Sequence, residues 1–410
     1  MGWSLLGGAV PLYPLYALFF TATGLTGGQI SALFAVWSVT GIVAEVPTGA
    51  LADRFSRRAA LAASGVLQAV GFAAWLVTPG FWGFLAGFVL WGVGGALASG
   101  ALEALLYDGL AATGAEDDYV RLSGRVDAAG LLAQVPAAGA AVLLYRMGGY
   151  QLAGWVSVGV CLAAALLALR LPEVPRTAGA DDGDGYFATL ARGVREAVVN
   201  RVVRTAVIAL AALAGLDAVE EYFPVIAADW RVPTGLNPLA GLVVTGGGVA
   251  GAWLASRAGA GRFQQCLMLA GAALAAGVAA LLRVPAGIVL LAVFYGLYRL
   301  VLVLVDARLQ RVIETGARAT VTSVAALATE VSALVLFAAW AAGGLPLVAA
   351  LTALLALVPL AAKGVPLAAK GVPLAAKGVP LAAKGVPLAA EGAATGTVAA
   401  PDSGISKPSR

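Results

Sequence analysis

The chain has 410 residues and a formal net charge of +4; 60% of its residues are hydrophobic and 12% are charged. Because soluble proteins carry about 25% charged residues, this composition excludes an ordinary soluble protein and indicates an integral membrane protein. The apolar runs do not alternate with polar residues, so we expect spanning helices of about 20 residues rather than barrel strands.

Hydropathy predicts twelve membrane-spanning helices in an all-α protein. The first six are expected at 2–22, 29–49, 58–78, 81–106, 124–145 and 150–171. The second six are expected at 202–225, 236–256, 264–282, 285–305, 319–342 and 345–362. Six spans, a linker and six more spans are the organisation of a duplicated bundle with two pseudo-symmetric halves.

Four segments follow from this pattern. They are an N-terminal six-helix bundle at 1–171, a polar linker at 172–201, a C-terminal six-helix bundle at 202–362 and a tail at 363–410. The tail continues a seven-residue repeat, Val-Pro-Leu-Ala-Ala-Lys-Gly, that begins at Val358 and carries Glu391 in its fifth copy. A Pro and a Gly in every unit exclude a coiled coil. The tail is expected to be disordered, and its Lys residues could also contact anionic lipid.

The Arg residues give the orientation of the bundle, since positive loops stay in the cytoplasm. With the N-terminus inside, the outer loops contain Arg146, Arg231 and Arg283. The inner loops then contain Arg54, Arg57, Arg58, Arg121, Arg125, Arg192, Arg195, Arg257, Arg262, Arg308, Arg311 and Arg318. We therefore expect a multi-pass protein of the cell membrane with both termini in the cytoplasm.

The connection after the second span, EVPTGALADRFSRR at 45–58, concentrates charges of both signs. A carboxylate such as Asp53 is stabilised at a helix N-terminus, and Arg binds carboxylates through charge-assisted hydrogen bonds. Asp108 ends the neighbouring fourth span at the same level. It is the expected partner of Arg57 or Arg58, although a solvated helix end explains it equally well.

Ten residues of this connection, Gly49-Ala-Leu-Ala-Asp53-Arg54-Phe-Ser56-Arg57-Arg58, resemble the loop motif G-x-L-A-D-R-x-G-R-R of the major facilitator superfamily. Ser56 stands where the family has Gly. The resemblance implies that Gly49, Asp53, Arg54, Arg57 and Arg58 belong to a gate that closes the cytoplasmic face. A degenerate copy follows the eighth span, where Ser256 replaces the acid and Arg257 and Arg262 remain.

Other stretches resemble bacterial efflux-type permeases of the same superfamily. They are Ser99–Leu110, Ala307–Gln310 and Arg318–Ser323. The fifth span matches the antiporter motif G-P-x-x-G-G only at Pro136 and Gly139. The fourth span has Phe88 where many proton-linked members carry Arg, so proton coupling through that Arg is not expected.

Charged residues inside the spans are expensive in lipid and usually face a cavity or a partner. The candidate cavity or proton-coupling residues are Glu45, Glu103, Asp127, Asp217, Arg299 and Glu330. Asp217 shares a helical face with Glu220 and Glu221, which could also line an exposed outer mouth. Arg299 lies deep in the tenth span, and Glu330, midway along the eleventh, is the counter-charge that the sequence offers. Their pair could be structural or functional.

Few residues are suited to other chemistry. The chain has no His, and Cys161 and Cys266 lie far apart, so a metal site or a disulfide framework is excluded. No phosphate-binding loop and no nucleophile motif are present. The N-terminus has no positively charged stretch ahead of its apolar run, so no cleaved signal peptide is expected.

The sequence therefore predicts a secondary transporter of small molecules that works by alternating access and is not an enzyme. Efflux of amphipathic compounds, driven by protons, fits the apolar and aromatic spans. Uptake of a small polar nutrient and a non-transporting membrane sensor are the alternatives. We expect a monomer in the lipid bilayer with no cofactor, no metal and no nucleic-acid partner.

Overall fold

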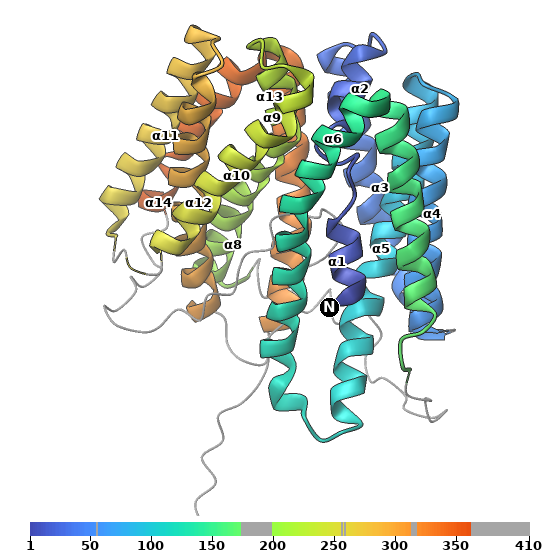
Figure 1. Ribbon diagram of the computed structural model, residues 1–410. Helices are drawn as coiled ribbons and strands as arrows, with labels where there is room; N and C mark the ends of the chain where they lie inside the picture. The colour runs from blue at the N-terminus through green and yellow to red at the C-terminus, as the bar shows by residue number, and fades with distance from the viewer. Residues whose placement is uncertain (55, 174–198, 256, 258–259, 313–317, 362–410) are drawn as a thin grey trace, which may run out of the picture.

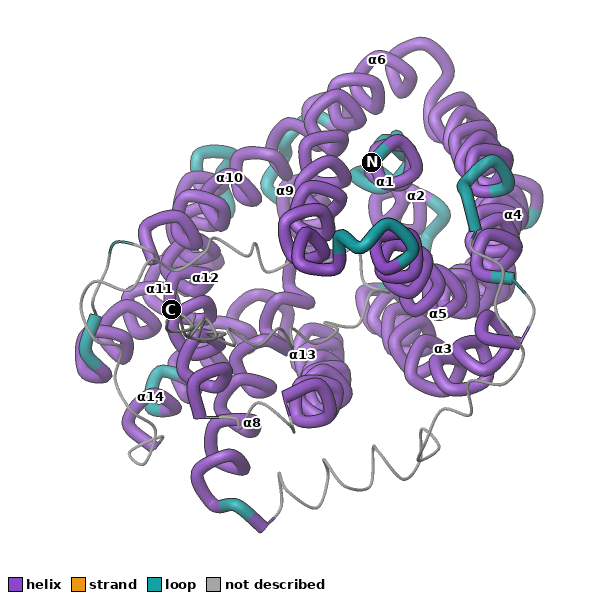
Figure 2. The backbone as a smooth tube through the Cα atoms, turned by 90° about the horizontal axis from the view of Figure 1, so that it is seen from below, coloured by secondary structure: helices purple, strands orange, loops and turns teal. Residues whose placement is uncertain are grey.

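The computed structural model of the chain describes residues 1–54, 56–173, 199–255, 257, 260–312 and 318–361. Every regular element within these ranges is a helix (Figure 1). The expected tail, 363–410, and most of the expected linker lie outside the described residues. The helices form two groups that lie side by side (Figure 2). One group is formed by the chain before the linker and the other by the chain after it.

The first group precedes the linker. It contains α1 (Gly2–Gly8), α2 (Tyr16–Ala22), α3 (Gly27–Arg54), α4 (Arg57–Val77), α5 (Phe81–Ala111), the short 3₁₀ helix η1 (Glu116–Asp118) and α6 (Tyr119–Ala168). Gly148 and Gly149 leave the helical conformation inside α6, with φ of 62° at Gly149. This break separates the fifth expected span from the sixth.

The second group follows the linker. It contains α8 (Arg201–Ala214), the 3₁₀ helix η2 (Gly215–Tyr222), α9 (Phe223–Asp229), the 3₁₀ helix η3 (Thr234–Leu236), α10 (Asn237–Ala255), α11 (Arg262–Leu282), α12 (Gly287–Val312), α13 (Arg318–Leu355) and α14 (Val358–Ala361). Gly344, with φ of 60°, breaks α13 between the eleventh and twelfth expected spans.

Each group has its own helix packing. In the first, α4 packs against α5 and α6, α3 against α5, and α1 against α6. In the second, α12 packs against α10 and α11, while α13 packs against α8 and α11.

Glycines make the closest of these helix contacts. A Cβ on Gly251 of α10 would lie 1.9 Å from the carbonyl oxygen of Gly296 in α12. In the first group, a Cβ on Gly71 of α4 would lie 2.9 Å from the carbonyl oxygen of Gly87 in α5. Small residues thus bring the helix backbones together, which is how helices associate where the solvent is as apolar as the side chains.

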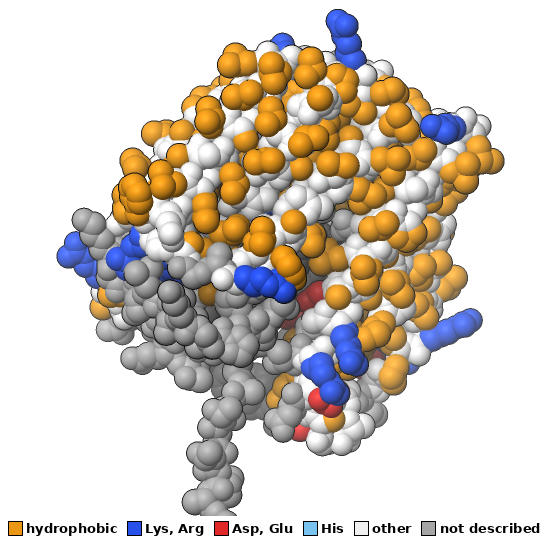
Figure 3. Space-filling model, turned by 60° about the vertical axis from the view of Figure 1, so that its left-hand side comes forward, with side chains coloured by type: hydrophobic (Ala, Val, Ile, Leu, Met, Phe, Trp, Pro, Cys, Tyr) orange, Lys and Arg blue, Asp and Glu red, His pale blue; other side chains and the backbone are white. Residues whose placement is uncertain are grey.

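Apolar side chains cover most of the visible outer face, and the Arg side chains lie toward its ends (Figure 3). Trp82, Leu274 and Leu281 are among the large side chains that the helices expose. Within the described ranges, nine helices are long and apolar enough to cross a membrane. Such a surface suits lipid rather than water, and the chain is a multi-pass membrane protein.

The first expected span, 2–22, is not one continuous helix. α1 ends at Gly8 and α2 begins at Tyr16. Pro11 and Pro14 lie between them, and Pro has no N–H with which to continue a helix. The N–H of Leu12 instead donates to Ser157 Oγ of α6, 2.9 Å away, which satisfies a backbone donor that would otherwise be unpaired in a lipid environment.

The seventh expected span is interrupted as well. Between α8 and α9, the eight residues of η2 adopt the tighter 3₁₀ conformation, and the N–H of Phe223 donates to the carbonyl of Glu220 three residues earlier. Pro224 follows directly; it cannot make the α-helical bond to Glu220, and its ring would clash with that carbonyl. The first span of each group is therefore irregular near its middle.

Among the described residues, the two groups pack against each other mainly through four pairs of elements. α3 packs against α13, α2 against α9, and α6 against both α10 and η3. In Figure 1, α2 and α9 lie in the upper part of the molecule, and the α5–α6 connection lies at its lower end. We call the end that contains residues 22–27 the α2 end, and the opposite end, which contains residues 56–58, the motif end.

Candidate functional site

At the motif end, Arg57 is held by its neighbour in the same group. Its Nη1 donates to the carboxylate of Asp108 near the end of α5 and to the carbonyl of Ala104, 2.7 Å away. The Arg57 side chain is 12% exposed and that of Asp108 is 35% exposed. The structure thus brings together the two residues that the sequence paired, both within the first group.

Glu173, which the sequence analysis missed, completes this cluster. Its carboxylate accepts hydrogen bonds from Ser56 Oγ and from the N–H of Arg57, each at 2.6 Å. It also lies 3.5 Å from Nε of Arg58. The N-terminus of α4 favours a negative charge at this place, so an acid directly after the sixth span was the available signal.

Ser56 departs from the family's loop motif and has a structural role of its own. It is the N-cap of α4, where its Oγ accepts from the N–H of Ala59 at 3.2 Å while donating to Glu173. Ser is among the best N-cap residues. The side chains of Gly49, Asp53 and Arg54, at the end of α3, lie outside the described residues.

The degenerate motif of the second group lies between α10 and α11. The guanidinium of Arg257 lies over the indole of Trp253, 3.4 Å from the ring centroid, in a cation–π contact. Arg262 is the first residue of α11. The position of the missing acid, Ser256, is outside the described residues.

A charged cluster lies inside the second group, around the middle of α12. Arg299 Nη1 lies 2.8 Å from Asp217 Oδ2, with side chains 3% and 13% exposed. The hydroxyl of Tyr295 donates to Asp217 at 2.8 Å and to Glu220 at 3.1 Å. The expectation that Glu330 neutralises Arg299 is corrected here: Asp217 is the bound carboxylate, because η2 packs beside α12 at that depth.

The common face expected for Asp217, Glu220 and Glu221 is divided. In a 3₁₀ helix, residues three apart eclipse each other, so Asp217 and Glu220 share Tyr295. Glu221 points elsewhere and accepts a hydrogen bond from the hydroxyl of Tyr16, in the first group. Since Tyr16 is buried, Glu221 lies between the groups rather than at an open mouth.

Two further hydrogen bonds join the groups, one toward the α2 end and one near the middle of α3 and α13. Ser31 Oγ and the Tyr222 hydroxyl are 2.7 Å apart, and Ser38 Oγ donates to the carboxylate of Glu330. Ser31, Ser38 and Tyr222 are buried. In each of the three described cross-group hydrogen bonds, counting that of Tyr16, the first group contributes a hydroxyl.

Aromatic rings fill the same interface. Phe34 of α3 lies 5.4 Å from Tyr222 and 5.7 Å from Phe337 of α13, measured between ring centroids. Tyr222 stacks on Trp340 at 4.1 Å. Because Phe34 meets Phe337 and Ser38 meets Glu330, α3 and α13 run antiparallel along this seam.

The other intramembrane acids lie on the motif-end side of the seam. Glu45 is half-buried two turns beyond Ser38, within electrostatic range of Glu330. Glu103 of α5 and Asp127 of α6 lie near Tyr119. Tyr119 itself lies just before the start of the membrane segment at Arg121. Burial, together with the charges of these two acids, raises the pKa of Tyr119 to about 12. Glu103 and Asp127 thus belong to the motif end rather than to the middle of the protein.

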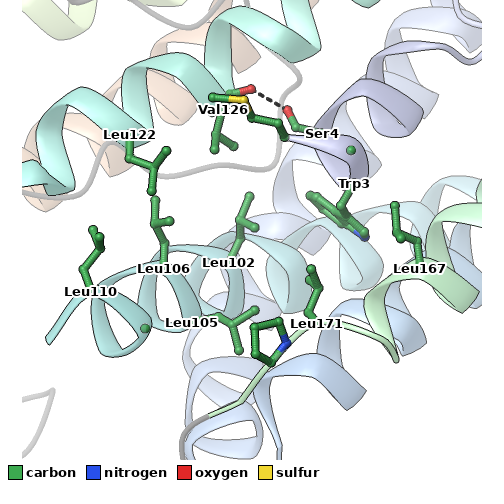
Figure 4. Close-up of a pocket in the computed structure, with 14 residues that line it drawn as sticks. Trp3, Ser4, Leu102, Leu105, Leu106, Leu110, Leu122, Val126, Leu167 and Leu171 are labelled. Atoms are coloured by element: carbon green, nitrogen blue, oxygen red, sulfur yellow. Dashed lines mark hydrogen bonds between the residues drawn. The ribbon is translucent and has the colours of Figure 1, made fainter. Parts of the chain in front are cut away.

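An apolar cavity of about 400 Å³ also opens near the start of the chain (Figure 4). Trp3, Leu102, Leu105, Leu122 and Leu171 are among its lining residues, and Ser4 Oγ beside it donates to the Val126 carbonyl at 2.6 Å. Its described lining contains no charged side chain. The cavity lies within one group and contains none of the candidate site residues.

Comparisons with solved structures extend over nearly the whole chain. A D-xylose–proton symporter superposes with a TM-score of 0.63 at 17% identity, covering 89% of this chain and 97% of that protein. A nucleoside transporter gives 0.63 at 10% identity, with 88% and 96% covered. The fucose:proton symporter of E. coli gives 0.54 at 17% identity, with the same coverage. At these identities the likeness establishes the fold.

Sequence comparisons agree with the fold. Two proteins of Mycobacterium tuberculosis, from strains CDC 1551 and H37Rv and each described as an uncharacterized MFS-type transporter, are 34% identical over 144 residues. The matched segment is 35% of this chain, and the chain spans about a third of the length of these relatives (34%). The family model of the Major Facilitator Superfamily matches residues 1–344. The chain therefore belongs to the Major Facilitator Superfamily, as its loop motif indicated.

Proposed function

We propose that the chain is a secondary active transporter that moves a small molecule across the membrane by alternating access. The observation that carries this proposal is the distribution of contacts between the groups. The described cross-group hydrogen bonds, at Tyr16, Ser31 and Ser38, lie on the α2 side of the seam. The described ion pairs of Arg57 and Arg58 at the motif end stay within the first group.

Halves whose described hydrogen bonds lie on one side of the seam fit one of the two states that alternating access requires. With the Arg-rich loops in the cytoplasm, the α2 end faces outward, and this state is open to the inside. The residues Gly49, Asp53, Arg54, Arg57, Arg58 and Asp108 would then close the motif end in the opposite state. Arg257 and Arg262 occupy the corresponding place in the second half.

A proton gradient is the proposed source of energy. The second half contains a hydrogen-bonded network whose carboxylates would bind and release the proton. It consists of the carboxylates of Asp217 and Glu220, the guanidinium of Arg299 and the hydroxyl of Tyr295. Glu330 and Glu45 lie across the seam from each other and are additional candidates. A buried ion pair adds little net stability compared with apolar residues of the same volume, which supports a functional role for this one.

The proposed substrate is amphipathic and the proposed direction is export. Near the break in the first span, Tyr13 stacks on Trp91 at 5.3 Å, and Trp37 lies 4.8 Å from the same ring. Aromatic surfaces of this kind suit a flat apolar solute. Uptake of a polar solute is the second candidate. Gln68 donates to the Tyr13 hydroxyl at 2.8 Å beside these rings, and two proteins of known structure that share this fold are proton symporters.

The test is solute flux in proteoliposomes that contain the purified full chain. A panel of fluorescent amphipathic dyes, with labelled sugars and nucleosides alongside, would be offered with and without a pH step. Dye movement that follows the pH step, and is lost in Asp217→Asn but retained in the surface variant Asp118→Asn, is the expected result. Flux that ignores the pH step would exclude proton coupling, and flux of a sugar or nucleoside alone would favour uptake.

A further inference from the structure

The segment η2, Gly215–Tyr222, is an unusual element to find inside a membrane span. A 3₁₀ helix rarely continues beyond three or four residues, because its hydrogen bonds are poorer than those of an α-helix. This one has eight residues and joins two α-helices end to end. A stretch of this kind has an α-helical alternative close in energy, and mid-helix 3₁₀ segments often mark functional hinges.

Two residues explain why the 3₁₀ form prevails here. Pro224 cannot donate to the Glu220 carbonyl, and its ring obstructs the α-helical register. Gly215 lies against α13, where a Cβ would be 2.4 Å from Cβ of Ser332. η2 is thus fixed to α13 at its start and denied an α-helical bond at its end.

The 3₁₀ register sends neighbouring acids to different partners. At about 120° per residue, Asp217 and Glu220 eclipse each other, and both reach the hydroxyl of Tyr295 in their own half. Glu221 lies about 120° around the axis and reaches Tyr16 of the other half. The same short segment therefore touches the Arg299 cluster and the closed seam.

An α-helical register would undo this division. At about 100° per residue, Glu221 would lie only about 40° from Asp217. Its carboxylate would turn toward the face of Tyr295 and away from Tyr16. The next residue, Tyr222, would turn by a similar angle away from Ser31. Conversion of this one segment would remove two of the three described bonds that join the halves.

We propose that Gly215–Tyr222 is a register switch: its 3₁₀ form holds the α2 end shut through Tyr16 and Ser31, and its α form releases that end. The switch links the Asp217–Arg299 pair to the seam, because Asp217, Glu221 and Tyr222 belong to the same short helix and turn together when its register changes. The proposal rests on the proposed alternating access, and it adds the element that performs the opening.

The experiment measures the opening directly. Spin labels would be placed through Gly28→Cys on α3 and Ala341→Cys on α13, both exposed at the α2 end, in a background of Cys161→Ala and Cys266→Ala. The full chain in lipid nanodiscs would give the distribution of label distances by pulsed electron resonance. This measurement needs no substrate, so it can succeed or fail independently of any transport assay.

Pro224→Ala is the decisive variant, because it restores the missing N–H and permits the α register. We expect a several-fold rise in the population with long label distances. Pro224→Gly should give a smaller rise, since Gly favours an α-helix less than Ala does. Pro285→Ala, an exposed Pro in the loop before α12, is the matched control and should leave the distribution unchanged.

The hydrogen bond between Tyr16 and Glu221, which we call the latch, has its own test in Tyr16→Phe and Glu221→Gln. Each should raise the open population, and the double variant should raise it no further than one of them, because both remove the same bond. A Pro224→Ala distribution identical to that of the parent, while Tyr16→Phe opens the α2 end, would overturn the switch. No response to either variant would overturn both the switch and the latch.

Discussion

The two ends of the molecule hold their charges in opposite ways. At the motif end, Arg57, Arg58, Asp108 and Glu173 bind one another inside the first half. Between the α2 end and the middle of the seam, the hydroxyls of Tyr16, Ser31 and Ser38 bind groups of the second half. Charge pairs that stay within one half do not oppose its motion, whereas hydroxyl bonds that cross the seam do. The role of a contact in opening therefore depends on which halves it joins, and not on whether it carries charge.

The largest expected effect lies between the two ends, at Arg299. Arg299→Leu removes the buried guanidinium that neutralises Asp217 and Glu220. Breaking a buried ion pair lowers the free energy of unfolding by about 3–5 kcal/mol. We expect a clear loss of thermal stability in detergent, followed by size-exclusion chromatography after heating, and loss of flux. The exposed Arg121→Leu should change neither. If the double variant Asp217→Asn with Arg299→Leu were no more stable than Arg299→Leu alone, the pair would not be the cause.

The next prediction tests the seam at Ser38. Ser38→Ala leaves the Glu330 carboxylate without its hydroxyl donor, at a cost of about 1–3 kcal/mol to the closed α2 end. The label distances between positions 28 and 341 should lengthen. The control is Ser99→Ala, because the buried hydroxyl of Ser99 bonds only to the Ala96 carbonyl of its own helix. Equal shifts in the two variants would remove Ser38 from the seam.

A smaller effect is expected at the motif end from Asp108→Asn. The pair with Arg57 is partly exposed, so its loss should cost about 1 kcal/mol or less. Flux should fall if this residue serves the gate, yet the label distances at the α2 end should not change. A change at the α2 end would mean that the two ends are not independent in this state, contrary to the comparison above.

The smallest expected effect is that of Glu173→Gln. The amide oxygen still accepts from the N–H of Arg57, while the amide NH2 faces Ser56 Oγ and can donate to it; the charge next to Arg58 is lost. A partly exposed pair of this kind contributes about 0.5 kcal/mol, so the melting temperature should move by little more than in Glu116→Gln, on the exposed η1. A large destabilisation would show that Glu173 fixes the start of α4 through its charge.

The sequence predicted best those features that depend on composition and local order. Hydropathy predicted an all-helical membrane protein, and the loop motif gave the family. The Arg57–Asp108 pair could be anticipated because Arg57 lies just before the third expected span, at the level where Asp108 ends the fourth. The partner of Arg299 could not, since it depends on the rotation of η2 about its axis, which differs between the 3₁₀ and α registers.

Pro residues in the sequence pointed to the interruptions of the spans, but the spans were predicted to be continuous. Pro11 and Pro14 lie inside the first expected span, and Pro224 near the end of the seventh. A Pro within a span does not by itself stop a helix, because neighbouring helices can satisfy the freed backbone groups. Whether they do depends on a partner such as Ser157, which is distant in sequence, and no local pattern identifies it.

The bond from Leu12 to Ser157 also bears on how the protein is made. The two residues are 145 positions apart, and domains emerge from the ribosome N-terminal part first. The first span enters the membrane long before the sixth has been synthesised, so its bent middle must wait for the hydroxyl that completes it. The first span therefore reaches its final conformation only after the sixth span has supplied Ser157. Truncation of the chain before Ser157 should leave the first span without that conformation.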